Sequence, residues 1–118
     1  MRSANVEWKS VDGVANPYLV LGGIVAAGLD GMERGLLLPP PVSADPDELS
    51  EEERAGGSIT RLPESLAAAT EALAGSTVLR EAMGEYLHDR VVAVRRAEAK
   101  ASAGLDEETL VARHRWRY

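Results

Sequence analysis

An apolar, glycine-bearing segment that follows Asn16-Pro17 most constrains what this chain can fold into. Asn is a preferred residue at a helix N-cap, and Pro suits the first helical position, so the pair predicts a helix start. The helix is expected to span residues 17–34 and to end before Gly35. Its apolar residues occupy more than one face, so we expect most of its sides to be buried; they are Leu19, Leu21, Ile24, Val25, Gly28, Leu29 and Met32. Its glycines each cost about 1 kcal/mol against Ala, which favours close contact with a neighbouring element at Gly22, Gly23 and Gly28.

A short strand is predicted before this helix, at residues 5–9, and the turn signal Asp12-Gly13 ends it. A single strand cannot provide hydrogen-bond partners for its own backbone N–H and C=O groups, so the partner strands are expected to lie outside this chain. Glu7 and Lys9 would share one face of the strand. A carboxylate beside a lysine can bind a divalent cation and a phosphate, although this spacing is more often typical of an exposed ion pair.

Residues 36–57 are predicted to form a loop that begins with a stiff run of three prolines. A short helical turn capped by Ser50 is expected within it. The ligand alternation of a calcium loop is missing from its acidic residues, so the pattern indicates a solvated loop. These acids are Asp45, Asp47, Glu48, Glu51, Glu52 and Glu53.

Three further helices are predicted, at residues 63–74, at residues 78–102 and, after a cap at Asp106, near Leu110 and Val111. The chain has no Phe and only 4% aromatic residues, so its core must be built mainly from Leu, Val and Ala. The expected fold is one small, mainly α domain with a single N-terminal strand. The buried stripe of the longest helix is expected to consist of Leu79, Met83, Tyr86, Leu87, Val91 and Val94.

The charge and residue usage exclude several classes of protein. The net charge of -6 argues against nucleic acid and against an anionic membrane as partners. With no cysteine, disulfides and thiolate metal sites are excluded, and a cytoplasmic location is expected. The first residues are too polar for a signal peptide, and the longest apolar stretch, residues 18–29, is too short to cross a bilayer.

The two histidines give weak signals. His88 follows Leu87 in the longest predicted helix and is expected to be a partly buried surface residue. Glu85 and His88 have the Glu-x-x-His spacing of carboxylate-bridged metal bundles, but a single copy favours a structural role. The basic C-terminal residues, which include His114 and Trp116, are expected to dock on a neighbouring subunit rather than to bind RNA.

Three blocks of sequence together resemble the glutamine synthetase family. Val6-Glu7-Trp8-Lys9, followed by the run DGVANPYL at residues 12–19, resembles a family strand, Val/Ile-Glu-x-Arg, that leads to D-G-x-A-N-P-Y-L. The runs AAGLDG at residues 26–31 and RLPESL at residues 61–66 resemble later family blocks in the same order. This resemblance covers essentially the whole chain. It implies that residues 1–118 are the C-terminal part of a catalytic α+β domain.

The resemblance also suggests roles for individual residues. Glu7 matches a glutamate that ligates an active-site divalent metal, Mg²⁺ or Mn²⁺, beside the phosphates of ATP. Lys9 stands where the family usually has an arginine that contacts the substrate and the transferring phosphoryl group; Arg offers a planar fork and Lys only a point charge. Asp47 lies near the position of a tyrosine that some bacterial members adenylylate, and without that tyrosine this control is not expected.

Three functions follow from the resemblance as expectations. The first is part of an ATP-dependent ligase that joins glutamate and ammonia; the second is part of a γ-glutamyl-polyamine or other amine ligase; the third is a non-catalytic module that binds related subunits. The other metal ligands and the nucleotide site lie upstream in the family. We therefore expect no catalytic residue, no tight binding of metal or ATP, and no activity in these residues alone. The implied partners are the remainder of the catalytic domain and the other subunits of a homo-oligomer.

Overall fold

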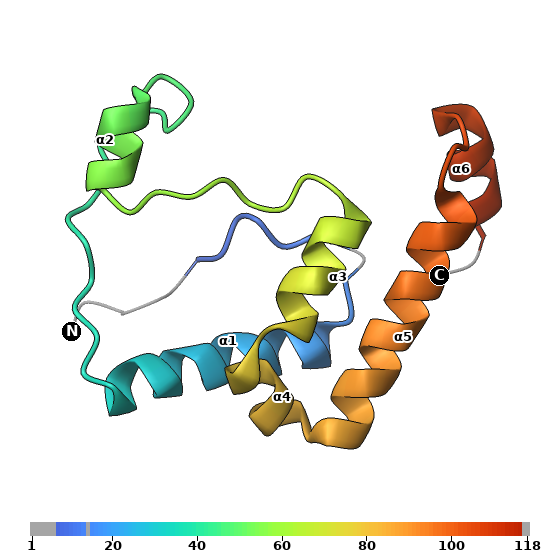
Figure 1. Ribbon diagram of the computed structural model, residues 1–118, viewed down its shortest axis with the longest axis horizontal. Helices are drawn as coiled ribbons and strands as arrows, with labels where there is room; N and C mark the ends of the chain where they lie inside the picture. Colours follow the sequence, from blue (N-terminus) through green and yellow to red (C-terminus); the bar gives the residue numbers. More distant parts are fainter. Residues whose placement is uncertain (1–6, 14, 117–118) are drawn as a thin grey trace.

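Helices and irregular connections make up the computed structural model, which describes residues 7–13 and 15–116 (Figure 1). The prediction of a mainly α chain is confirmed. The strand predicted at residues 5–9 lies partly outside the described residues; residues 7–9 form no strand, and no partner strand exists in the described part of the chain. The helices are α1 (Pro17–Glu33), α2 (Glu51–Gly56), α3 (Leu66–Ala74), α4 (Thr77–Met83), α5 (Glu85–Ser102) and α6 (Glu107–His114).

Both ends of α1 are formed by the residues that predicted them. The side chain of Asn16 accepts hydrogen bonds from the backbone N–H groups of Tyr18 and Leu19, at 3.0 and 3.2 Å. At the other end Gly35 has φ of +61°, and its N–H donates to the carbonyl of Met32. A second bond runs from Leu36 N–H to the carbonyl of Gly31, which completes a Schellman motif. Local sequence therefore determines where α1 begins and ends.

The expected burial of α1 on most sides is wrong for the described chain. One face, which includes Val20 and Ile24, is half-buried, and Gly23 lies so close to α4 that a Cβ there would stand 3.6 Å from Leu79. Gly22 and Gly28 face open space, so only one of the three expected close approaches exists. The opposite face is an exposed stripe at helical spacing, formed by Tyr18, Leu21, Val25, Leu29 and Met32.

The helices α2 and α3 also begin at side-chain caps. Ser50 caps α2 as predicted, and its N–H donates to Glu53, which holds the pKa of that carboxyl below its usual value. The start of α3 is three residues later than predicted. Ser65 accepts from Ala68 N–H at 3.1 Å, and an N-cap residue is not itself helical, so Pro63 lies outside the helix.

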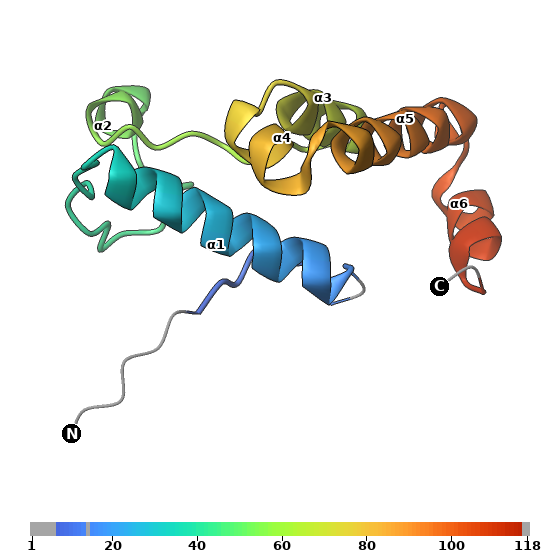
Figure 2. The ribbon, with the colours of Figure 1, turned by 90° about the horizontal axis from the view of Figure 1, so that it is seen from below.

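The single helix predicted for residues 78–102 is divided into α4 and α5 by Gly84. This glycine has φ of 74° and ψ of 149°, a conformation that only glycine adopts readily. The chain therefore turns a corner, after which α5 packs against α3 (Figure 2). Arg96 on α5 forms two hydrogen bonds of 2.8 Å with the carboxylate of Glu71 on α3 and holds the pKa of that carboxyl below its usual value.

The corner also changes which residues of α5 are buried. Leu79 and Met83 on α4 are half-buried, as is Val91, but Tyr86, Leu87 and Val94 are exposed, against prediction. The stripe was predicted as if one helical phase ran through residues 78–102, and the break at Gly84 resets that phase. The buried residues of α5 are instead His88 and Val92.

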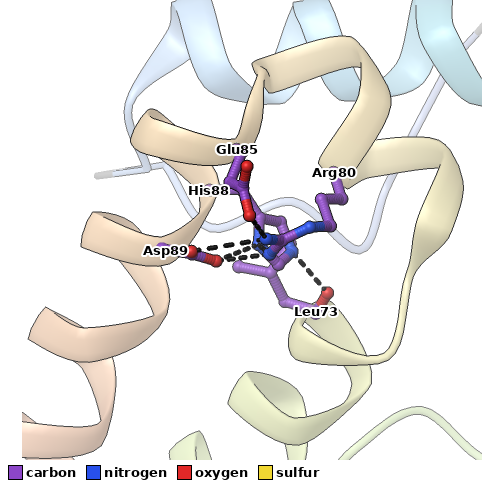
Figure 3. Close-up of polar contacts among 5 residues, drawn as sticks. All are labelled: Leu73, Arg80, Glu85, His88 and Asp89. Carbon is purple, nitrogen blue, oxygen red and sulfur yellow. Dashed lines mark hydrogen bonds and ion pairs between the residues drawn. The ribbon is translucent and has the colours of Figure 1, made fainter.

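A polar cluster fills the inside of the corner (Figure 3). The prediction of a partly buried surface residue is wrong for His88, whose exposure is only 1%. The carbonyl of Leu73 can only accept, so the Nε2–H of His88 donates to it at 3.0 Å. On the other side Nδ1 lies 3.2 Å from the guanidinium of Arg80, which also donates to Asp89 and, at 2.5 Å, to Glu85. Arg80 thus joins α4 to the first turns of α5.

Replacing Arg80 with Ala is expected to raise the pKa of Asp89. Hydrogen bonds from Arg80 are the main cause that holds the pKa of Asp89 below its usual value. Because the folded pKa is the lower one, the pair contributes stability above pH of about 4, and this is lost as the pH falls through the folded pKa. A carboxyl titration by NMR measures the change. An unchanged pKa for Asp89 in Arg80→Ala would show that the pair does not form in solution.

Replacing Gly84 with Ala is expected to open the corner. A non-glycine residue at this φ and ψ costs about 1–3 kcal/mol, while a straight helix through residue 84 has no such cost. The low pKa of Asp89 is the measurable signature of the closed corner and should move toward its usual value. Gly22→Ala is the matched control, because Gly22 lies inside α1 and faces open space. Equal responses of Asp89 to both substitutions would refute a special role for Gly84.

Candidate metal- and substrate-binding segment

Glu7 and Lys9 lie side by side in the irregular segment before α1. The Lys9 Nζ is 4.0 Å from Glu7 Oε1, and the two side chains are 81% and 76% exposed, respectively. Such an exposed pair contributes little to stability. Both charged groups are therefore open to a ligand, and the arrangement brings together the two residues that the sequence singles out.

Trp8, between them, lines a groove of about 470 Å³ formed by α1 and α4. Its indole Nε1–H donates to the Ser10 hydroxyl at 2.6 Å, and 57% of the residue remains exposed. Sequence reasoning missed this position, because the groove depends on how α1 packs on α4. Its other lining residues are Leu19, Val20, Gly23, Ile24, Ala27, Asp30, Ser76, Val78 and Leu79.

A tight turn connects this segment to α1. Ala15 N–H donates to the carbonyl of Asp12 at 3.0 Å, which confirms the turn predicted at Asp12-Gly13. Asn16 then caps α1, so only a few residues separate the exposed pair from a fixed helix end. From this turn the segment runs back along α1, because Trp8 lines the same groove as Ile24 and Ala27 in the middle of that helix.

Glu7 meets part of the requirement for binding a hard divalent cation. A carboxylate is the ligand type that Mg²⁺ prefers, and Mg²⁺ is commonly bound through one or two carboxylates together with waters and substrate phosphates. Within residues 7–13 and 15–116 no group of three or more His, Asp or Glu side chains could hold a metal. Glu7 can therefore supply one ligand, and further ligands would have to come from other parts of a larger site.

The remaining candidates from the sequence lie apart from this segment. Asp47 pairs with Arg61 at 2.7 Å, and Arg61 also reaches Glu64 at 3.1 Å, so the acidic loop is tied to the residues before α3. His88 is enclosed in the corner cluster. His114 is at the end of α6, which Arg113 ties to α5 through the Ala101 carbonyl at 2.7 Å.

In the part of the chain that the structure describes, none of the helices combines the length and the hydropathy that a bilayer crossing requires.

Comparison with known proteins gives a consistent result. Residues 1–111 match the family described as glutamine synthetase, catalytic domain. The chain is 44% identical over 117 residues to a gamma-glutamylpolyamine synthetase of Streptomyces coelicolor, 99% of this chain and 25% of that protein. A glutamine synthetase of Methanocaldococcus jannaschii is 34% identical over 97 residues, which is 82% of this chain. One of Staphylococcus aureus is 37% identical over 90 residues, which is 76% of this chain. These stretches are 21% and 20% of those two proteins, so the chain spans a quarter or less of the length of its relatives.

Proposed function

The chain belongs to the glutamine synthetase catalytic-domain family, and from this we propose that it is one segment of an ATP-dependent ligase that forms γ-glutamyl amides with a polyamine. The observation that carries the choice of amine is the 44% identity to a gamma-glutamylpolyamine synthetase over 99% of the chain. The two glutamine synthetases are less similar to this chain and match a smaller share of it. Ammonia is the alternative amine.

The proposed reaction has two steps. The γ-carboxylate of glutamate takes the terminal phosphoryl group of ATP, giving ADP and an acyl phosphate. The amine then attacks the acyl carbon, displaces phosphate and loses a proton. A divalent cation would neutralise phosphate charge in such a site.

Two residues of this chain have roles in the proposed site. Glu7 would supply one carboxylate ligand to the cation, and its 76% exposure leaves the carboxylate open to do so. Lys9, also exposed, would hold a positive point charge toward the phosphoryl group. A point charge imposes less geometry than the arginine fork usual in the family.

The partners in this proposal are the remaining parts of the catalytic domain and the other subunits of a homo-oligomer. The support is the large apolar surface that the described chain leaves open, above all the exposed stripe of α1 and Leu36, Leu37 and Leu38. ATP and Mg²⁺ or Mn²⁺ would bind to the complete site rather than to this segment. Activity is accordingly not expected from the 118 residues alone.

Two chimeric enzymes test the proposal. In the first, termed the carrier ligase, this chain replaces the matching quarter of the Streptomyces coelicolor enzyme; in the second it replaces the matching fifth of the Staphylococcus aureus glutamine synthetase. Phosphate release from ATP and glutamate is measured with putrescine, spermidine or ammonia. The proposal expects the carrier ligase to retain polyamine-dependent phosphate release. The second chimera is expected to release phosphate more slowly.

Two other outcomes have clear meanings. Greater activity of the second chimera, with ammonia, would favour the ammonia ligase instead. Soluble, assembled chimeras that are inactive with all three amines would overturn both ligase functions. The remaining hypothesis would then be the non-catalytic module. It predicts that the 118-residue chain binds to the intact relatives.

A further inference from the structure

Trp8 lies between the two candidate functional residues but on a different surface. Glu7 and Lys9 are exposed and 4.0 Å apart at their charged ends. Trp8 instead lines the groove between α1 and α4, beside Ile24 and Leu79. The segment therefore has one large, partly exposed aromatic side chain at the groove and two charged side chains in solvent.

We propose that Trp8 is a positioning residue, which holds Glu7 and Lys9 at a fixed height above the α1–α4 groove; this rests on the proposed function. A short irregular segment has many backbone conformations, and each one moves its carboxylate. The indole restricts this segment in two ways. Its side chain lines the groove, and its N–H donates to Ser10 on the other side of Lys9, at 2.6 Å.

The groove itself is suited to hold an aromatic ring in one place. It is formed by two helices that contact each other closely, because Gly23 brings the backbone of α1 next to Leu79 of α4. Its lining is mostly aliphatic, and an indole gains more from such a surface than a smaller side chain does. The position of the carboxylate of Glu7 is thus linked to the packing of α1 on α4.

The test uses metal binding, read separately from turnover. In the carrier ligase, free Mn²⁺ is measured by electron paramagnetic resonance, and the Mg²⁺ midpoint for phosphate release is measured in parallel. Trp8→Ala is expected to weaken Mn²⁺ binding and raise the midpoint about 10-fold, which is the scale for residues that orient a metal ligand. Trp8→Phe is expected to restore both, because a phenyl ring still presents an aromatic surface to the groove.

Tyr86→Ala is the matched control, since Tyr86 is an exposed aromatic residue that does not line the groove. Unchanged Mn²⁺ binding in Trp8→Ala would overturn the inference, as would equal changes in Trp8→Ala and Tyr86→Ala. Failure of the proposed function has a different signature. In that case the unsubstituted carrier ligase itself shows no turnover with any amine.

Discussion

Glu7→Gln in the carrier ligase is expected to lower glutamate- and polyamine-dependent phosphate release by about 100-fold or more. Glutamine has the shape of glutamate but no charge, so it is a poor ligand for a hard cation. A metal in such a site supplies several kcal/mol of stabilisation to the transition state, and each 1.36 kcal/mol lost is a tenfold loss of rate. Raising the Mg²⁺ concentration should restore part of the rate.

Glu64→Gln is the control for this substitution. Glu64 is also an exposed glutamate paired with a basic residue, Arg61, but it is remote in sequence from the Glu7 segment. Its substitution is expected to change the rate less than about twofold, since exposed pairs contribute little. Similar losses in the two variants, or a Glu7→Gln loss that Mg²⁺ does not alter, would remove Glu7 from the proposed site.

The 118-residue chain by itself is expected to unfold without a sharp cooperative transition. Val92 is the one apolar side chain fully buried in the described part of the chain. The chain exposes 10,318 Å², whereas a compact monomer of this mass exposes about 6,200 Å². Its radius of gyration is 17.1 Å, against about 13.5 Å for a compact domain of this length. Little apolar surface is therefore buried on folding, and the hydrophobic effect contributes little to the stability of the chain.

Calorimetry and circular dichroism of the purified chain test this expectation. Helix signal should fall gradually with temperature, with no heat-absorption peak, and urea should give a similarly broad profile. In the carrier ligase, by contrast, amides of α1 should be protected from hydrogen exchange, because a partner would cover the exposed stripe. A sharp transition with a matching calorimetric enthalpy would show that the segment is an independent domain.

The features that sequence reasoning predicted well are those determined within a few residues. Asn16, Ser50 and Asp106 each cap a helix where they were expected to, because a cap is a bond between near neighbours. The break at Gly84 was missed, since an isolated glycine in a helical pattern is tolerated at a cost of about 1 kcal/mol against Ala and so does not by itself predict a break. That omission also displaced the predicted buried stripe of α5 and left His88 outside it.

In the candidate site, too, sequence reasoning found the features that neighbouring residues determine and missed those that depend on the fold. Glu7 and Lys9 could be found from the family motif, and their proximity follows from being two residues apart. The groove that Trp8 lines could not, because it depends on residues from α1 and α4 that are about 50 positions apart in sequence. Similarly, the Arg80 contacts with Glu85 and Asp89 require the corner that no local pattern predicted.

The adjacent glycines of α1 set different limits on side-chain size. Gly22 faces open space, so a Cβ added there meets no atom within 4 Å. At Gly23 a single carbon would meet Leu79 at 3.6 Å, an ordinary contact, and a bulkier side chain that points at Leu79 would push the two helices apart. Because the groove under Trp8 is the space between those helices, residue 23 sets its width. Because glycine is the smallest residue, a substitution there can only add volume between the helices, and it does so without touching a charged group.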